Sequence, residues 1–115
     1  MYTYFLFMYR KIIHIRYMDP KIIRILSLPK QVYTTYTHVD DIDDLILGRY
    51  IRWAYTDELT LYPGGFLVSV DPKTNVLLCK KGFRLFTVSF DVAIVLQKMS
   101  LDERIIQRAR KIMQS

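Results

Sequence analysis

The feature that most constrains the fold is a series of short extended segments, separated by turn residues, within residues 48–98. Residues 49–55 alternate in a way that predicts a strand with Ile51, Trp53 and Tyr55 on one face. Four further segments have the β-branched and aromatic character of strands: residues 66–70, 76–81, 84–90 and 92–96. The last of them is apolar throughout, which predicts a strand buried on both faces.

The residues between these segments are turn formers. Pro63-Gly64-Gly65 fits a type II turn, which needs a positive φ where Gly64 stands. Residues 71–75, with the sequence DPKTN, predict a hairpin connection. Gly82 predicts a further turn or bulge. Short strands at this even spacing indicate a small β-barrel or sandwich.

A C-terminal helix is predicted within residues 99–115. Ser100 and Glu103 form the capping-box pattern that starts a helix. An apolar stripe, which must bury against the barrel or against a partner, follows at helical spacing: Leu101, Ile105, Ile106, Ala109, Ile112 and Met113. Three cations share another side of this helix, a pattern typical of a solvated face: Arg104, Arg108 and Lys111.

Residues 19–47 form a lead-in to the barrel. Asp19-Pro20 is a helix-start signal, but the following residues 21–28 suit a short helix or a strand equally well. Residues 31–37 are expected to be extended, and residues 39–47 to form one or two helical turns that end at Gly48. The predicted fold class is therefore mostly β with a C-terminal helix, built on an SH3-like barrel of about five antiparallel strands.

Residues 1–18 form an aromatic and basic arm. The arm is too short and too charged for a membrane span, and its charge follows the apolar run rather than preceding it, unlike a secretory signal. It is interpreted as a strand or a poorly ordered end, as a membrane-surface anchor, or as the product of an extended reading frame whose natural start is Met8 or Met18. Its aromatic residues are candidate protein-interface residues: Tyr2, Tyr4, Phe5, Phe7 and Tyr9.

Charge is unevenly distributed along the chain. Seventeen Lys and Arg residues against 11 Asp and Glu give a net charge of +6. An acidic cluster divides the basic arm from the basic remainder: Asp40, Asp41, Asp43 and Asp44. This cluster does not match a calcium loop. Its carboxylates are interpreted as a solvated helix start, as a docking surface for a basic partner, or as ligands for a divalent ion completed by a partner.

The inventory of reactive residues argues against an enzyme. One cysteine, Cys79, and two histidines, His14 and His38, exclude an internal disulfide, a zinc finger and an iron–sulfur site. Cys79 lies within a predicted strand and is expected to be buried. No glycine-rich phosphate loop is present. The sequence therefore predicts a non-enzymatic protein without metal or cofactor, located in a reducing intracellular compartment.

Basic and aromatic residues on neighbouring predicted strands suggest a second kind of site. A sheet face with rings for stacking and cations for phosphates is how several small barrels bind single strands. The candidate nucleic-acid-binding residues are Tyr50, Arg52, Trp53, Lys80, Lys81 and Arg84. Trp53, however, shares its predicted face with Ile51, which favours a place in the core.

The stretch LGRYIRWAY, followed by PGGFLVSVD and NVLLCKKGFRLFTVSF, resembles an SH3-like or Tudor-like barrel. Together with YTTYTHVDDIDDL it also resembles small uncharacterised proteins of large nucleocytoplasmic DNA viruses, over roughly residues 33–98. The resemblance implies a minor virion component or a nucleic-acid-associated accessory protein. The first hypothesis is thus a structural or protein-interaction module that self-associates or binds other subunits, and the alternative is a nucleic-acid-binding barrel.

Overall fold

The computed structural model describes residues 18–114, so the arm residues predicted as a protein interface, Tyr2, Tyr4, Phe5, Phe7 and Tyr9, lie outside the described residues. No helix in the described part of the chain is long and apolar enough to cross a membrane. The elements in chain order are α2 (Pro20–Ile25), α3 (Lys30–Tyr33), β1 (Tyr36–Val39), η1 (Ile42–Asp44), β2 (Tyr50–Tyr55), β3 (Gly65–Asp71), β4 (Val76–Lys81), β5 (Arg84–Ser89), η2 (Phe90–Val92), β6 (Ala93–Lys98) and α4 (Leu101–Gln114).

All six strands belong to one antiparallel sheet in the order β1-β6-β2-β3-β4-β5. The predicted class, mostly β with a C-terminal helix, is confirmed. The predicted closed barrel is wrong, because β1 and β5 are the two edges of the sheet and do not pair with each other. The additional strand is β1, which comes from the end of the segment expected to be extended, while α3 replaces the beginning of that segment.

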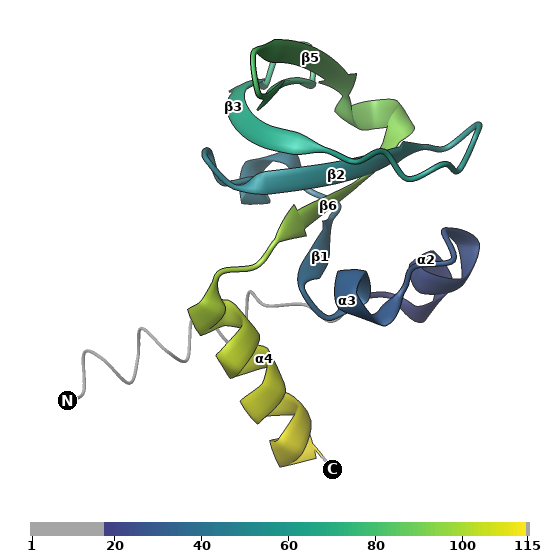
Figure 1. Ribbon diagram of the computed structural model, residues 1–115, viewed down its shortest axis with the longest axis vertical. Helices are drawn as coiled ribbons and strands as arrows, with labels where there is room; N and C mark the ends of the chain where they lie inside the picture. The colour runs from purple at the N-terminus through teal and green to yellow at the C-terminus, as the bar shows by residue number, and fades with distance from the viewer. Residues whose placement is uncertain (1–17, 115) are drawn as a thin grey trace, which may run out of the picture.

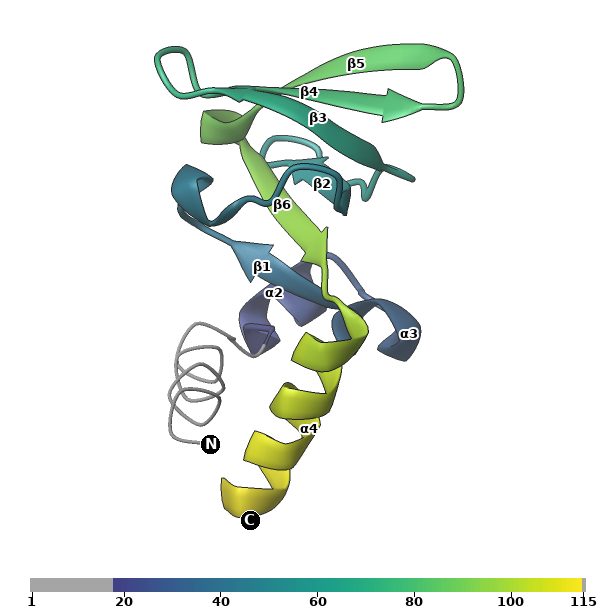
Figure 2. The same ribbon diagram turned by 90° about the vertical axis from the view of Figure 1, so that its left-hand side faces the viewer.

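The sheet changes direction sharply where β2 passes into β3. The two strands pair only at Tyr50 with Phe66 and at Ile51 with Gly65. Gly64 just before them has φ +96°, and a Cβ atom there would lie 2.2 Å from the carbonyl oxygen of Ile51. Only glycine fits this close approach, so the predicted need for a positive φ at Gly64 is confirmed. As a result, β3, β4 and β5 lie over β2 and β6 as a second layer (Figures 1 and 2).

The bent sheet has a hydrophobic core on each of its faces. The inner core lies between the two layers and contains Ile51, Trp53, Leu67, Leu77, Cys79, Val88 and Val95. The helix-side core lies beneath α2 and α3 and contains Met18, Ile22, Leu26, Leu28, Val32, Ala54 and Leu96. The neighbours Val95 and Leu96 belong to different cores, so β6 is buried on both faces, as its apolar sequence predicts.

The helix α2 forms because a local capping signal selects the helix for residues that fit either state. The Asp19 carboxylate accepts a hydrogen bond from the backbone N–H of Lys21 (2.8 Å), and Pro20 stands at the first turn of α2. Ile22 and Val32 then turn inward from α2 and α3 onto the helix-side core. The two short helices thereby cover one face of the sheet; the sequence left α2 open between helix and strand, whereas it predicted an extended segment where α3 forms.

The bend between β2 and β3 predicts that the stability of the fold is especially sensitive to a substitution at Gly64. We expect Gly64→Ala to reduce the free energy of unfolding by about 3 kcal/mol, because the new Cβ would meet the backbone of β2 in a left-handed conformation. Gly82→Ala is the matched control, since Gly82 also has a positive φ but open space around it, and should cost only about 1 kcal/mol. Urea unfolding followed by circular dichroism measures both, and equal losses would contradict this account of the bend.

Candidate binding surfaces

A cavity of about 660 Å³ opens between the two layers of the sheet. Its residues come from β2, from the turn before β3, and from the β4–β5 hairpin: Trp53, Tyr55, Tyr62, Pro63, Gly64, Lys81, Arg84, Phe86 and Thr87. The cavity exists because the sheet stays open, so that β5 faces β2 across a space instead of pairing with it. We call it the aromatic cavity.

The aromatic rings of the cavity support one another. Tyr62 stacks on Trp53, with ring centroids 5.9 Å apart and planes 16° from parallel, and meets Tyr55 edge to face at 5.7 Å. The Tyr62 hydroxyl donates a hydrogen bond to Glu58, and this bond raises the pKa of Tyr62. The tyrosine therefore stays neutral over the physiological pH range and presents a flat, uncharged wall to the cavity.

Lys81 and Arg84 bring positive charge to this cavity. They are direct partners across the β4–β5 ladder, next to the hairpin turn, and both are exposed. Within residues 18–114, neither side chain forms a hydrogen bond or an ion pair. Like charges directly opposite one another are unfavourable in a sheet. An anion bound between them would relieve that repulsion.

The structure brings together only half of the predicted nucleic-acid-binding residues. Trp53, Lys81 and Arg84 line the aromatic cavity. Tyr50 and Arg52 point from the other face of β2, because successive side chains of a strand alternate.

Both of these side chains hold the turn before β3. The Tyr50 hydroxyl donates to the carbonyl of Pro63 (3.1 Å) and Nε of Arg52 donates to that of Tyr62 (3.0 Å). Lys80 lies on the outer face of the second layer, between Phe66 and Leu85 in the strand register.

Sequence reasoning missed Tyr62 and Phe86 as cavity residues. Tyr62 belongs to a turn whose path depends on the close approach of Gly64 to β2. Phe86 lies on the same side of β5 as Arg84, because one residue separates them on the strand. Their convergence with Trp53 depends on the bend, which brings strands that are distant in the sheet order face to face.

A second surface lies on α4. The apolar stripe was expected to be covered, but of its residues only Ile106 is buried in the structure, whereas Leu101 is 68% and Ile105 57% exposed. A hollow of about 400 Å³ runs along this side of the helix and is lined, among the described residues, by Leu101, Arg104, Ile105, Arg108, Ala109 and Ile112. We call this side the α4 stripe. It is apolar at its centre and cationic along one margin.

A third surface is acidic and surrounds η1. Asp41, Asp43 and Asp44 are exposed, and the Asp41 carboxylate accepts the backbone N–H of Asp43 (2.9 Å), which starts the short helix. Ile46 and Leu47 follow directly, and Leu47 is 60% exposed. No cluster of three or more potential metal ligands occurs within residues 18–114. We call residues 40–47 the acidic segment; it combines carboxylates with exposed apolar side chains.

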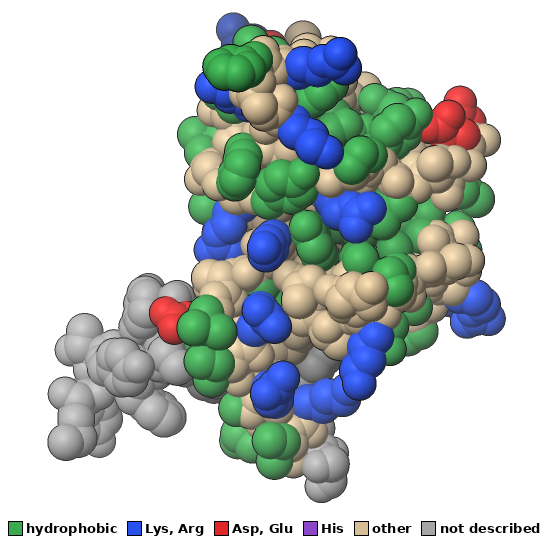
Figure 3. Space-filling view, viewed as in Figure 1, with side chains coloured by type: hydrophobic (Ala, Val, Ile, Leu, Met, Phe, Trp, Pro, Cys, Tyr) green, Lys and Arg blue, Asp and Glu red, His purple; other side chains and the backbone are tan. Residues whose placement is uncertain are grey.

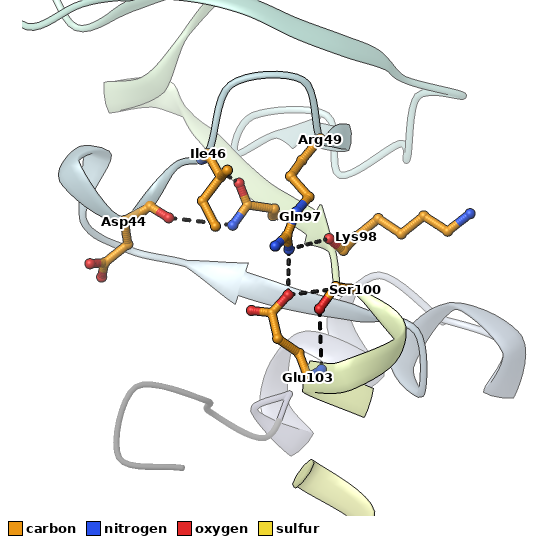
Figure 4. A network of polar contacts seen from close by, with 7 residues as sticks. All are labelled: Asp44, Ile46, Arg49, Gln97, Lys98, Ser100 and Glu103. Atoms are coloured by element: carbon orange, nitrogen blue, oxygen red, sulfur yellow. Dashed lines mark hydrogen bonds and ion pairs between the residues drawn. The ribbon is translucent and has the colours of Figure 1, made fainter. Parts of the chain in front are cut away.

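The acidic segment is attached to the sheet by Gln97 (Figure 4). The side chain of Gln97 is only 4% exposed, a rare position for an amide. Its Oε1 accepts the backbone N–H of Ile46 (2.8 Å), and its Nε2 donates to the carbonyl of Asp44 (3.3 Å). Both polar atoms are therefore satisfied, and the acidic segment is tied to β6.

The start of α4 is attached to the sheet by Arg49 (Figure 4). Its guanidinium donates to the Glu103 carboxylate and to the carbonyl of Lys98 (3.2 Å). Glu103 also accepts the backbone N–H of Ser100 (2.8 Å), while the Ser100 hydroxyl accepts the N–H of Glu103 (3.2 Å). This reciprocal pair confirms the predicted capping box. Burial alone would raise the pKa of Glu103, but the bonds from Ser100 and Arg49 outweigh it and lower the pKa.

Cys79 belongs to the inner core and is fully buried. Burial raises the pKa of its thiol to about 11, so the thiol is protonated at neutral pH. Because the thiolate is the reactive form, Cys79 is a packing residue.

Charge is also segregated over the molecular surface. Figure 3 shows Lys and Arg side chains spread from the sheet down to α4 on one face, with Asp and Glu only near its margins. Such a face attracts polyanions and acidic partners.

Comparisons of the chain with family models, curated proteins and solved structures found no match.

The lowered pKa of Glu103 makes the attachment of α4 sensitive to acid. Ionised Glu103 stabilises the fold above its ordinary pKa of 4.5, and this contribution is lost as the pH falls through the lower folded-state pKa. We therefore expect Glu103→Gln to lose less unfolding free energy than the wild type between neutral and acidic pH. Urea titrations at a series of pH values measure this, with the exposed neighbour substitution Asp102→Asn as the control. Parallel pH profiles for wild type and Glu103→Gln would contradict the assignment.

Proposed function

We propose that the protein is a non-enzymatic structural module whose copies assemble head to tail, with the α4 stripe of one copy docked on the acidic segment of the next. The observation that carries the proposal is the exposure of Leu101 and Ile105 on a helix held to the sheet through Glu103. Contiguous exposed apolar surface of this kind marks protein contact sites on soluble domains.

The two surfaces are complementary in both composition and charge. The α4 stripe offers Leu101 and Ile105 beside Arg104 and Arg108, and within the described chain no carboxylate pairs with these two arginines. The acidic segment offers Ile46 and Leu47 beside Asp41, Asp43 and Asp44. Apolar contact at the centre and opposite charges at the rim are the usual arrangement of an interface.

Both surfaces are open in the same copy. In Figures 1 and 2, α4 leads away from the sheet, whereas the acidic segment stays against the sheet through Gln97. A contact between two different surfaces repeats from copy to copy and gives chains or rings rather than a closed dimer. Such repetition suits a structural component.

A symmetric antiparallel pairing of two α4 helices is less favourable. Arg104, Arg108 and Lys111 lie on one margin of the stripe, because they are spaced three and four residues apart. Two stripes packed antiparallel bring the same margins together, so these cations would face their own copies. The like-charge repulsion selects the acidic segment as the occupant of the stripe.

Two variants can each disable one of the two surfaces that form the head-to-tail contact. Ile105→Asp disables the α4 stripe, and Asp43→Lys with Asp44→Lys disables the acidic segment. At tens of micromolar we expect wild-type oligomers in sedimentation velocity, monomers for each variant alone, and one-to-one dimers when the two variants are mixed. The mixture recovers a dimer because each variant keeps the one surface that the other lacks.

Phe83→Asp is the control, since Phe83 is a fully exposed apolar residue at the tip of the β4–β5 hairpin, away from both surfaces. It should assemble as the wild type does. A monomeric wild type, or a mixture that stays monomeric, would refute the proposal.

A further inference from the structure

The aromatic cavity points to a binding activity that is separate from assembly. We propose that it binds single-stranded nucleic acid, with a base stacked between Tyr62 and Phe86 and the adjoining phosphates held by Lys81 and Arg84. All four residues line the cavity, and none of them belongs to the α4 stripe or the acidic segment.

The size and lining of the cavity fit a base. Its volume of about 660 Å³ lies within the range of small-molecule sites, and its walls carry four aromatic rings. Tyr62 and Phe86 are partly exposed, whereas Trp53 is covered by Tyr62 and supports it from behind. Flat rings stack on bases of any sequence, so this lining predicts little sequence preference.

The charges beside the cavity fit a phosphate. Lys81 and Arg84 stand directly opposite each other in the ladder, with no carboxylate partner in the described part of the chain. Two adjacent cations at the mouth of an apolar cavity attract an anion attached to a flat group, which is the chemistry of a nucleotide.

The surroundings of the cavity favour a strand over a single nucleotide. Lys and Arg side chains lie on one face of the molecule from the sheet down to α4 (Figure 3). A cationic surface that extends past a stacking site follows the backbone of a single strand. An acidic peptide would interact with the two cations but not with the aromatic walls. The experiment below distinguishes its binding from that of a nucleic acid.

The test uses a fluorescein-labelled oligothymidylate with the full chain. We expect binding in fluorescence anisotropy that weakens linearly on a log–log plot against salt. Trp53 is the only tryptophan in the chain and lines the cavity, so its emission should fall on saturation. Phe86→Leu, which keeps an apolar side chain but removes the ring, should weaken binding about tenfold.

Charge variants separate the site from a general attraction. Lys81→Ala with Arg84→Ala should weaken binding and lower the salt slope by about 1.4, since each phosphate contact on a single strand contributes about 0.7. Lys21→Ala with Lys73→Ala removes the same charge from exposed positions outside the cavity and should leave the affinity within about twofold.

Four results would overturn the assignment: no binding at low salt, equal losses in the two charge variants, equal competition by polyglutamate, and binding of thymidine monophosphate as tight as that of the oligonucleotide. The first three exclude a stacking site for nucleotides. The last restricts the site to a free nucleotide and excludes the strand.

Discussion

Where β2 passes into β3, the backbone of Gly64 lies against the carbonyl oxygen of Ile51, closer than any residue with a Cβ atom could come. This contact allows the chain to reverse over β2, so that β3, β4 and β5 form a second layer above β6. The inner core fills the space between the layers, and the aromatic cavity is the part of that space that the open sheet leaves uncovered. The packing of the two layers and the presence of the aromatic cavity therefore both result from the close approach of Gly64 to Ile51.

A second constraint is the set of side-chain bonds near the end of β6. Gln97 holds the acidic segment, while Arg49 joins the carbonyl of Lys98 to Glu103 at the start of α4. Gln97 is the buried member of this set, and both of its side-chain polar atoms are bonded, as a buried polar group requires. The network attaches two surfaces of opposite charge to one sheet, which is what repeated assembly requires, and the cavity lies on separate residues.

The local features could be read from the sequence: the strand faces of Ile51 and Trp53, the positive φ of Gly64 and the capping box at Ser100. Each depends on neighbours in the chain. The open sheet could not be predicted, since alternation shows which residues share a strand face but not whether the edge strands meet. For the same reason the sequence grouped Lys81 with Arg52, whereas the structure places Lys81 at the aromatic cavity and Arg52 on the other face of β2. The sequence did contain a sign of the role of Gln97, since it is the one amide in a mostly apolar strand. The structure shows that this amide is buried.

The central claim, that copies assemble through the α4 stripe and the acidic segment, is tested most directly by zero-length cross-linking. Carbodiimide joins a lysine amine to a carboxylate in direct contact, and Lys111 lies on the cationic margin of the stripe. In an equal mixture of unlabelled and heavy-nitrogen protein, the account requires cross-linked peptides that join Lys111 of one isotope to Asp43 or Asp44 of the other. Cross-links within one isotope only, or from Lys111 to carboxylates outside residues 40–47, would contradict it.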